Sequence, residues 1–175
     1  MENPVNIQYN RAKKELNGSL YAPYQTDGVM WMLRRENENM GSRGGFLCDE
    51  MGLGKTVQVV STILGNPKGR SLIVVPKSII TQWKTEIAKF APQLNVHVFD
   101  GPKRNEKENL VAMNSSDIVI SPYSVLTKYS ELHRIQWDRI VLDEAHEIRN
   151  KSSVTYKSIC KLDAMIKWVV TGTPV

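Results

Sequence analysis

Six short apolar runs, rich in valine and isoleucine, alternate with longer amphipathic stretches along this 175-residue chain. Strands buried on both faces, with helices between them, are typical of an α/β fold. The pattern therefore predicts a mostly parallel sheet with helices on both faces, and chemistry at the carboxyl ends of the strands. The predicted strands are Gly45–Cys48, Ser71–Val75, Val96–Phe99, Asp117–Ser121, Arg139–Leu142 and Trp168–Thr171.

The length fits one domain. We expect residues 1–20 to form an irregular N-terminal arm and residues 21–175 to form the domain. Pro23 favours a helix start, because proline in the first turn gives up no backbone hydrogen bond. Apolar residues at helical spacing predict a second helix around Ile79–Phe90, and Ser121-Pro122 resembles an N-cap followed by proline.

Composition limits the class of protein. Apolar residues make up 41% and charged residues 23%, which is typical of a globular chain. The net charge of +5 favours an anionic partner. Cys48 and Cys160 stand far apart without metal-site spacing, which argues against a disulfide scaffold or a zinc site and indicates a reducing, intracellular setting. The polar N-terminus does not resemble a signal peptide, and no apolar run approaches the roughly 20 residues of a membrane span.

A phosphate-binding loop is predicted after the first strand, where Asp49-Glu-Met-Gly-Leu-Gly-Lys-Thr56 opens a helix. Gly52 and Gly54 let the backbone approach phosphate oxygens, Lys55 can reach the β- and γ-phosphates, and the Thr56 hydroxyl can bind magnesium. Asp49 departs from the strict pattern, which has glycine at that position. The alternative is an ordinary tight strand–helix turn that contains Gly-Lys-Thr by chance.

An acidic pair follows the strand Arg139–Leu142. Asp143 is placed to hold the hydration shell of magnesium, and Glu144 to orient or deprotonate an attacking water. The alternative is a solvated acidic loop. His146 is predicted to contact the γ-phosphate side or to couple to a neighbouring strand, and a plain hydrogen-bonded loop histidine fits it equally well.

Five segments, in this order, resemble the first RecA-like lobe of the Swi/Snf family of DNA-dependent ATPases. They are Tyr24-Gln25 with Gly28 and Trp31 (Q motif), Leu72–Pro76 through Gln82-Trp83 (motif Ia), Ile120–Leu126 (motif Ib or Ic), Trp137–Asn150 (extended motif II) and Trp168–Val175 (motif III). The resemblance implies a RecA-like P-loop fold that binds ATP and Mg²⁺, with Gln25 on the adenine. Its motif II leans toward the repair branch of Rad-type translocases or a viral relative.

The resemblance also implies partners. Lys77, Ser78, Ser121 and Tyr123 fall at positions expected to contact a duplex DNA backbone, and Thr171 and Thr173 at positions that couple nucleotide and DNA. Residues 68–89 carry five basic side chains and one acidic one, which suits salt-sensitive backbone binding or simply a solvated face. We interpret Trp83, in phase with the apolar side of its helix, as core packing. Thr171 and Thr173 also fit a simple turn.

No segment resembles the second RecA-like lobe, with its arginine fingers, so we expect this lobe alone to hydrolyse ATP very slowly. Such lobes act in DNA movement, chromatin remodelling or repair, which implies the nucleus of a eukaryote, or the host nucleus or cytoplasm for a viral protein. Two alternatives remain. One is an RNA helicase lobe, against which Thr171-Gly-Thr-Pro argues, and the other is a non-catalytic module that docks on a protein.

Overall fold

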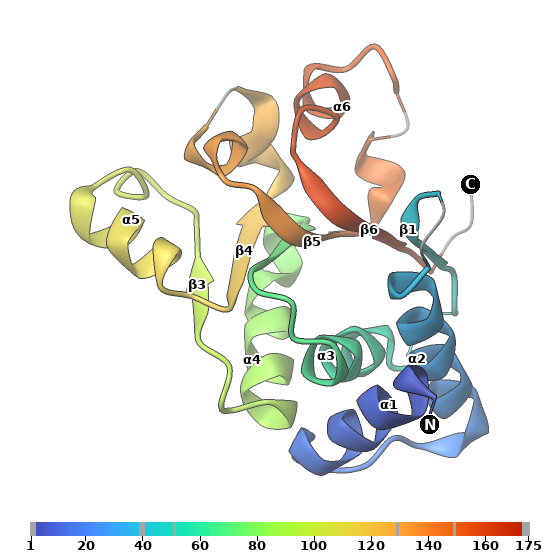
Figure 1. The fold of residues 1–175 in the computed structure, drawn as a ribbon. Coiled ribbons are helices and arrows are strands. Elements are labelled where there is room, and N and C mark those ends of the chain that lie inside the picture. The colour runs from blue at the N-terminus through green and yellow to red at the C-terminus, as the bar shows by residue number, and fades with distance from the viewer. Residues whose placement is uncertain (1–2, 39–40, 51, 129, 149, 173–175) are drawn as a thin grey trace.

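Six parallel strands form one sheet in the computed structural model, in the order β1-β6-β5-β2-β4-β3 (Figure 1). The structure describes residues 3–38, 41–50, 52–128, 130–148 and 150–172. The predicted α/β sheet with helices on both faces is confirmed, and all of its strand pairs are parallel. The strands are β1 Arg43–Leu47, β2 Ser71–Val75, β3 Val96–Val98, β4 Ile118–Pro122, β5 Trp137–Asp143 and β6 Ala164–Val170.

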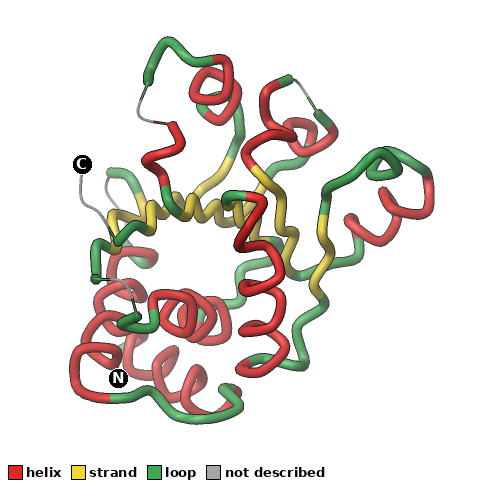
Figure 2. Tube along the Cα trace, turned by 180° about the vertical axis from the view of Figure 1, so that it is seen from behind, coloured by secondary structure: helices red, strands yellow, loops and turns green. Residues whose placement is uncertain are grey.

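Helices cover both faces of the sheet (Figures 1 and 2). One face carries α2, α3 and α4, with α1 packed outside them against α2 and α3, and the other carries α6 and short 3-10 helices. The α-helices are α1 Pro4–Glu15, α2 Ala22–Glu36, α3 Lys55–Gly65, α4 Ile80–Phe90, α5 Lys107–Asn114 and α6 Val154–Ile159. The 3-10 helices are Lys77–Ile79, Tyr123–Thr127, Glu131–Arg134 and Ala145–Ile148. Among the described residues, no helix combines the length and the apolar character needed to cross a membrane.

Alternate residues of the central strands enter two separate cores. In β2, Ile73 and Val75 pack into the core beneath α3 and α4, whereas Leu72 and Val74 pack into the core on the opposite face. All five residues of β2 are buried. This arrangement is the physical reason for the uninterrupted apolar runs, since strands between two helical layers have no solvent-facing side.

The predicted strands match the observed ones to within a few residues, except at the start of the last strand. Here β6 begins at Ala164, four residues before the predicted Trp168. Met165 is 56% exposed and Lys167 also reaches solvent, so the apolar run appears broken in the sequence. One side of β6 is less completely covered than the central strand β2. Buried and exposed residues therefore alternate along β6, whereas β2 is buried throughout.

The irregular arm predicted for residues 1–20 is wrong, because Pro4–Glu15 forms helix α1. Asn3 caps this helix by accepting the Val5 amide on its side chain, and Pro4 occupies the first turn. A Cβ added at Gly65 of α3 would come within 2.7 Å of the Gln8 carbonyl oxygen, so α1 and α3 approach closely. The Asn-Pro pair was the sequence signal for this helix.

The helix start predicted at Ser121-Pro122 is also wrong. Both residues belong to β4, paired with Val74 and Val75 of β2, and the following 3-10 helix begins at Tyr123. The Ser121 hydroxyl donates to the Phe99 carbonyl oxygen instead of capping a helix. A buried strand that ends in serine and proline therefore imitates a helix N-terminus in the sequence.

A buried ion pair joins α2 to the sheet. The Glu36 carboxylate accepts two hydrogen bonds from Arg139 of β5, at 2.6 and 2.5 Å, and both side chains are within 1% of complete burial. Glu36 also accepts from the Trp168 indole of β6 and from the Asn66 amide. The remaining Arg139 donors reach the Ser71 hydroxyl and the Asn66 carbonyl oxygen. Two charges are thus satisfied without water.

Replacing Arg139 with methionine should lower the free energy of unfolding by about 3–5 kcal/mol, because it leaves Glu36 as an uncompensated buried charge. Urea denaturation followed by circular dichroism measures the loss. Arg11→Met is the matched control, since Arg11 pairs with Glu15 on the exposed side of α1. That change should cost less than about 1 kcal/mol. Equal losses for the two variants would contradict the account of the buried pair.

Candidate nucleotide-binding site

The predicted phosphate loop and acidic pair meet in one cavity at the carboxyl edge of the sheet. This cavity has a volume of about 250 Å³. The loop follows β1 and the acidic pair ends β5, while β6 lies between these two strands. The lining residues are Gly52, Gly54, Lys55, Thr56, Ile79, Gln82, Trp83, Glu86, Asp143 and Glu144.

The phosphate loop ends in a left-handed turn that only glycine accommodates easily. Gly54 is the N-cap of α3 with φ of 77°, and Gly52 has φ of 84°. A Cβ at Gly54 would lie 2.4 Å from the Gln25 side-chain nitrogen, whereas the space around Gly52 is open. The loop therefore delivers its backbone and the N-terminus of α3 to the cavity, which is an arrangement suited to phosphate.

Gln25 is buried behind this loop and holds it in place. Its side-chain oxygen accepts the Tyr21 amide at 2.6 Å, and its nitrogen donates to the Leu53 carbonyl oxygen at 3.1 Å. Sequence reasoning assigned Gln25 to adenine and missed this bracing contact. The contact explains why Gln25 must sit at the start of α2. The adenine role stays a prediction.

Lys55 and Asp49 organise the charge of the loop. The Lys55 ammonium donates to the carbonyl oxygens of Asp49 and Glu50, at 2.8 and 2.9 Å, so that the loop curves around a cation. Asp49 accepts the Gln58 side-chain amide of α3 at 2.8 Å. This bond accounts for the aspartate at a position where the strict pattern has glycine, because its carboxylate ties the start of the loop to the helix that follows.

Asp143 is almost completely buried at the end of β5. Its Oδ2 accepts the Trp83 indole N–H at 2.7 Å, and its Oδ1 accepts the Glu144 amide at 2.9 Å. Burial raises the pKa of Asp143 above its ordinary value, although these two hydrogen bonds and the nearby Lys55 charge favour the ionised form. A bound divalent cation would favour the carboxylate further.

Glu144 and His146 continue from Asp143. Glu144 has a left-handed backbone with φ of 50°, which is unusual for a residue other than glycine, and its amide also donates to the Val170 carbonyl oxygen of β6. Its carboxylate lies 3.1 Å from His146 Nδ1. Thus His146 contacts the predicted water-orienting residue, whereas its contact with a γ-phosphate stays a prediction.

The residues predicted to contact DNA divide into two groups. The Lys77 side chain is 71% exposed, 3.0 Å from the Asp100 carboxylate, and Ser78 is exposed beside it. The pKa of Asp100 lies below its ordinary value. Burial alone would raise this pKa, but the hydrogen bond from Lys77 and the charges of Lys77 and Arg104 lower it by more. In contrast, the Ser121 and Tyr123 side chains are buried, with the Tyr123 hydroxyl donating to the Asp143 carbonyl oxygen. The prediction that Ser121 and Tyr123 contact DNA is therefore not supported by this arrangement of side chains.

Thr171, predicted to couple the nucleotide and DNA sites, follows β6 directly and is buried. Its amide donates to the Leu47 carbonyl oxygen at the end of β1, immediately before the phosphate loop. It therefore connects the ends of β6 and β1, and its coupling role stays a prediction. Thr173, assigned the same role, lies outside the described residues.

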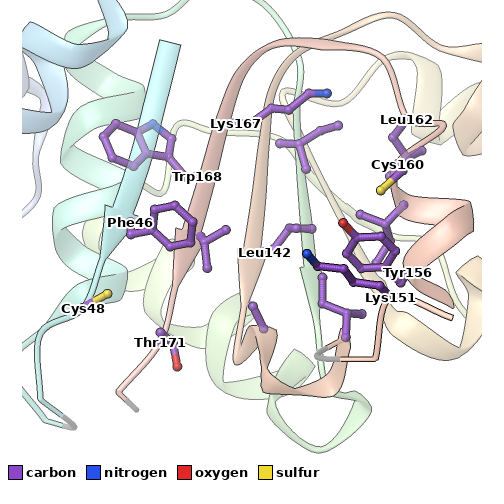
Figure 3. Close-up of a pocket in the computed structure, with 15 residues that line it drawn as sticks. Phe46, Cys48, Leu142, Lys151, Tyr156, Cys160, Leu162, Lys167, Trp168 and Thr171 are labelled. Carbon is purple, nitrogen blue, oxygen red and sulfur yellow. The ribbon is translucent and has the colours of Figure 1, made fainter. Parts of the chain in front are cut away.

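A larger apolar groove lies beside the site on the other face of the sheet, over β1, β6 and β5 (Figure 3). Its volume is about 700 Å³. Phe46 and Cys48 line one side and Tyr156 and Cys160 the other, with Leu142 between them. The described lining contains two lysines and no carboxylate, so the groove offers no anionic oxygen ligand for the magnesium of a nucleotide. Volume alone would therefore select the groove, whereas the predicted phosphate loop and acidic pair line the smaller cavity.

Comparison with known proteins identifies the family of the chain. The protein-family model that describes the SNF2-related domain matches residues 24–175 of this chain. The chain belongs to the SNF2-related domain family. This result confirms the resemblance to Swi/Snf proteins, and the phosphate-binding role of the Gly-Lys-Thr turn stays a prediction.

Individual relatives of this SNF2-related chain include remodelling and repair proteins. The Saccharomyces cerevisiae ISWI chromatin-remodeling complex ATPase ISW1 is 31% identical over 97% of the chain and 16% of that protein. The Danio rerio DNA excision repair protein ERCC-6-like is 36% identical over 98% of the chain and 12% of that protein. The solved Sulfolobus solfataricus SWI2/SNF2 ATPase core in complex with dsDNA matches with a TM-score of 0.79 and 31% identity, covering 91% of this chain and 33% of that one.

Substituting the two loop glycines with alanine should separate backbone strain from steric conflict. Gly52→Ala adds strain of about 1–2 kcal/mol, because a left-handed backbone disfavours a Cβ. Gly54→Ala adds the same strain and also a clash with Gln25, which should cost about 1–3 kcal/mol more. Chemical denaturation of both variants provides the comparison, and equal losses would show that Gln25 does not brace the loop.

Proposed function

We propose that this chain is the ATP-binding lobe of a DNA-dependent ATPase of the Swi/Snf type. In this proposal, ATP hydrolysis is coupled to movement on duplex DNA or to remodelling of protein–DNA complexes. One observation carries the proposal: Lys55, Thr56, Asp143 and Glu144, far apart in the sequence, line a single cavity. The place of action is DNA, in the nucleus of a eukaryote or in the host nucleus or cytoplasm for a viral protein.

Each side chain of the cavity has a role that its position supports. Lys55 binds the β- and γ-phosphates of ATP, assisted by the amides at the N-terminus of α3. Glu144 orients or deprotonates the attacking water, and its contact with His146 fixes the direction of its carboxylate. Gln25 holds the Leu53–Gly54 part of the loop in place behind the phosphates through its hydrogen bond to Leu53. In its predicted role it also contacts the adenine.

The donor set fits Mg²⁺. Thr56 offers a hydroxyl and Asp143 a carboxylate in the same cavity, and magnesium prefers oxygen ligands. Among the described residues no cluster of three or more metal-binding side chains exists, which suits a metal held by one or two protein oxygens together with water and phosphates. Bound there, Mg²⁺ would neutralise charge on the phosphates. Asp143 would act on it through water.

DNA contact is proposed on the surface formed by Lys77 and Ser78, at the carboxyl end of β2. Lys77 is exposed and its partner Asp100 can be exchanged for a phosphate at small cost, because an exposed ion pair contributes only about 0–1 kcal/mol. The structural relative solved in complex with dsDNA supports duplex DNA as the partner over RNA. A backbone-directed contact of this kind is independent of sequence.

A second RecA-like lobe is proposed as the other partner. The described residues of the cavity supply Lys55 as cation and no arginine, so developing charge on the transferred phosphoryl group is incompletely met. An arginine supplied in trans accelerates related hydrolases by about 10³–10⁵. We therefore expect slow turnover by this chain alone. The alternative of a non-catalytic docking module has less support, because the four residues assigned to phosphate, magnesium and water all line the cavity.

Lys55→Ala should weaken ATP binding by about 1.5–3 kcal/mol, because it removes a charge-assisted contact with phosphate. Isothermal titration calorimetry with Mg²⁺ measures the change. Lys151→Ala, which removes a lysine from the apolar groove, is the control and should leave the affinity unchanged. Equal affinities for wild type and Lys55→Ala would refute the assignment of the phosphate site.

Lys77→Ala should reduce the dependence of DNA affinity on salt, lowering the slope of log affinity against log salt by about one unit. Fluorescence anisotropy with a labelled duplex at several salt concentrations measures the slope. Lys14→Ala on α1 removes the same charge elsewhere and should leave the slope unchanged. Ser121→Ala should also have no effect, because that hydroxyl is buried. If Ser121→Ala changed the slope as much as Lys77→Ala does, the assignment of DNA binding to the Lys77–Ser78 surface would be wrong.

A further inference from the structure

Trp83 makes a polar contact that core packing does not require. It lies on α4 and is 2% exposed, among the apolar side chains of the core beneath α3 and α4. Its indole Nε1 donates to Asp143 Oδ2 at 2.7 Å, across 60 residues of sequence. The ring thereby presents its single donor to one particular carboxylate oxygen.

Asp143 is held at both carboxylate oxygens and at its backbone carbonyl oxygen. Trp83 donates to Oδ2, the Glu144 amide donates to Oδ1, and the Tyr123 hydroxyl donates to the backbone carbonyl oxygen of the same residue. One donor on each oxygen fixes the plane of the carboxylate. The lone pairs that these donors do not use then point in defined directions, and the cavity that Trp83 helps to line contains Lys55 and Thr56 as well.

We propose that Trp83 is a positioning residue for Mg²⁺, which sets the orientation in which Asp143 receives the hydrated metal. The proposal rests on the proposed function, in which Asp143 acts on Mg²⁺. Outer partners of metal-binding groups typically change metal affinity by about 10–100-fold when they are removed, because a ligand that can rotate must be ordered on binding. The Trp83 indole N–H is an outer partner of this kind, because it hydrogen-bonds the carboxylate of Asp143.

The location of α4 gives the contact a wider setting. Lys77 and Ser78 occupy the 3-10 helix that leads directly into α4. The proposed DNA-contacting segment and the donor to Asp143 are therefore parts of one continuous helical stretch. Trp83 is the point at which this stretch is hydrogen-bonded to the nucleotide cavity.

Trp83→Phe removes the donor and keeps an aromatic ring. The Mn²⁺ affinity of the protein–ADP complex, measured from the free-ion signal in electron paramagnetic resonance, should fall by about 10–100-fold. Calorimetric affinity for ADP in EDTA should remain unchanged, because the phosphate loop is intact. If the smaller phenyl ring prevents folding, β-(3-benzothienyl)alanine at position 83 replaces the N–H group with sulfur in a ring of nearly the same shape.

Trp137→Phe is the matched control, since Trp137 is equally buried and donates its indole N–H to the Leu132 carbonyl oxygen, away from the cavity. It should lose stability without losing metal affinity. Unchanged Mn²⁺ affinity in Trp83→Phe, together with weakened affinity in Asp143→Asn, would overturn the proposal and leave the proposed function standing. Unchanged affinity in Asp143→Asn would overturn both. Equal weakening of ADP binding with and without metal would show that Trp83 is only structural.

Discussion

The buried pair of Glu36 and Arg139 is the interaction on which the arrangement of the lobe depends. It joins the end of α2 to β5, and through the Trp168 indole it also joins β6. Ionised groups in an apolar interior are costly unless each is fully paired, and here each has at least three partners. Because α2 starts at the residues that brace the phosphate loop and β5 ends at Asp143, the pair fixes the two elements that carry opposite sides of the site.

Strand order then explains why a working site needs the whole sheet. The loop follows β1 and the acidic pair ends β5, but β6 separates them. Two backbone hydrogen bonds connect the three strand ends, from Thr171 to Leu47 and from Glu144 to Val170. The unusual left-handed backbone of Glu144 occurs at one of these links. Strain of this kind, about 1–3 kcal/mol, persists where the surrounding structure determines it, and it is concentrated at functional sites.

Sequence reasoning brought the predicted site residues to one cavity because their patterns are local. A phosphate loop and a carboxylate at a strand end depend on a few consecutive residues, so Lys55, Thr56, Asp143 and Glu144 could be placed before the fold was known. Contacts between distant segments could not be predicted in this way. The bonds from Gln25 to Leu53 and from Trp83 to Asp143 require the packing of two helices against the loop and β5. The N-cap role expected for Ser121 was wrong for the same reason, because the pattern showed that it ends a strand but not that its hydroxyl donates to the Phe99 carbonyl oxygen.

The central claim is that nucleotide binds at the smaller cavity between the phosphate loop and Asp143, and not in the larger apolar groove. Amide hydrogen exchange with and without a non-hydrolysable ATP analogue and Mg²⁺ tests it most directly. The account predicts new protection of residues 52–57, at the loop and the first turn of α3, and of residues 143–145. Protection confined to the groove, around Phe46 and residues 156–162, would contradict it.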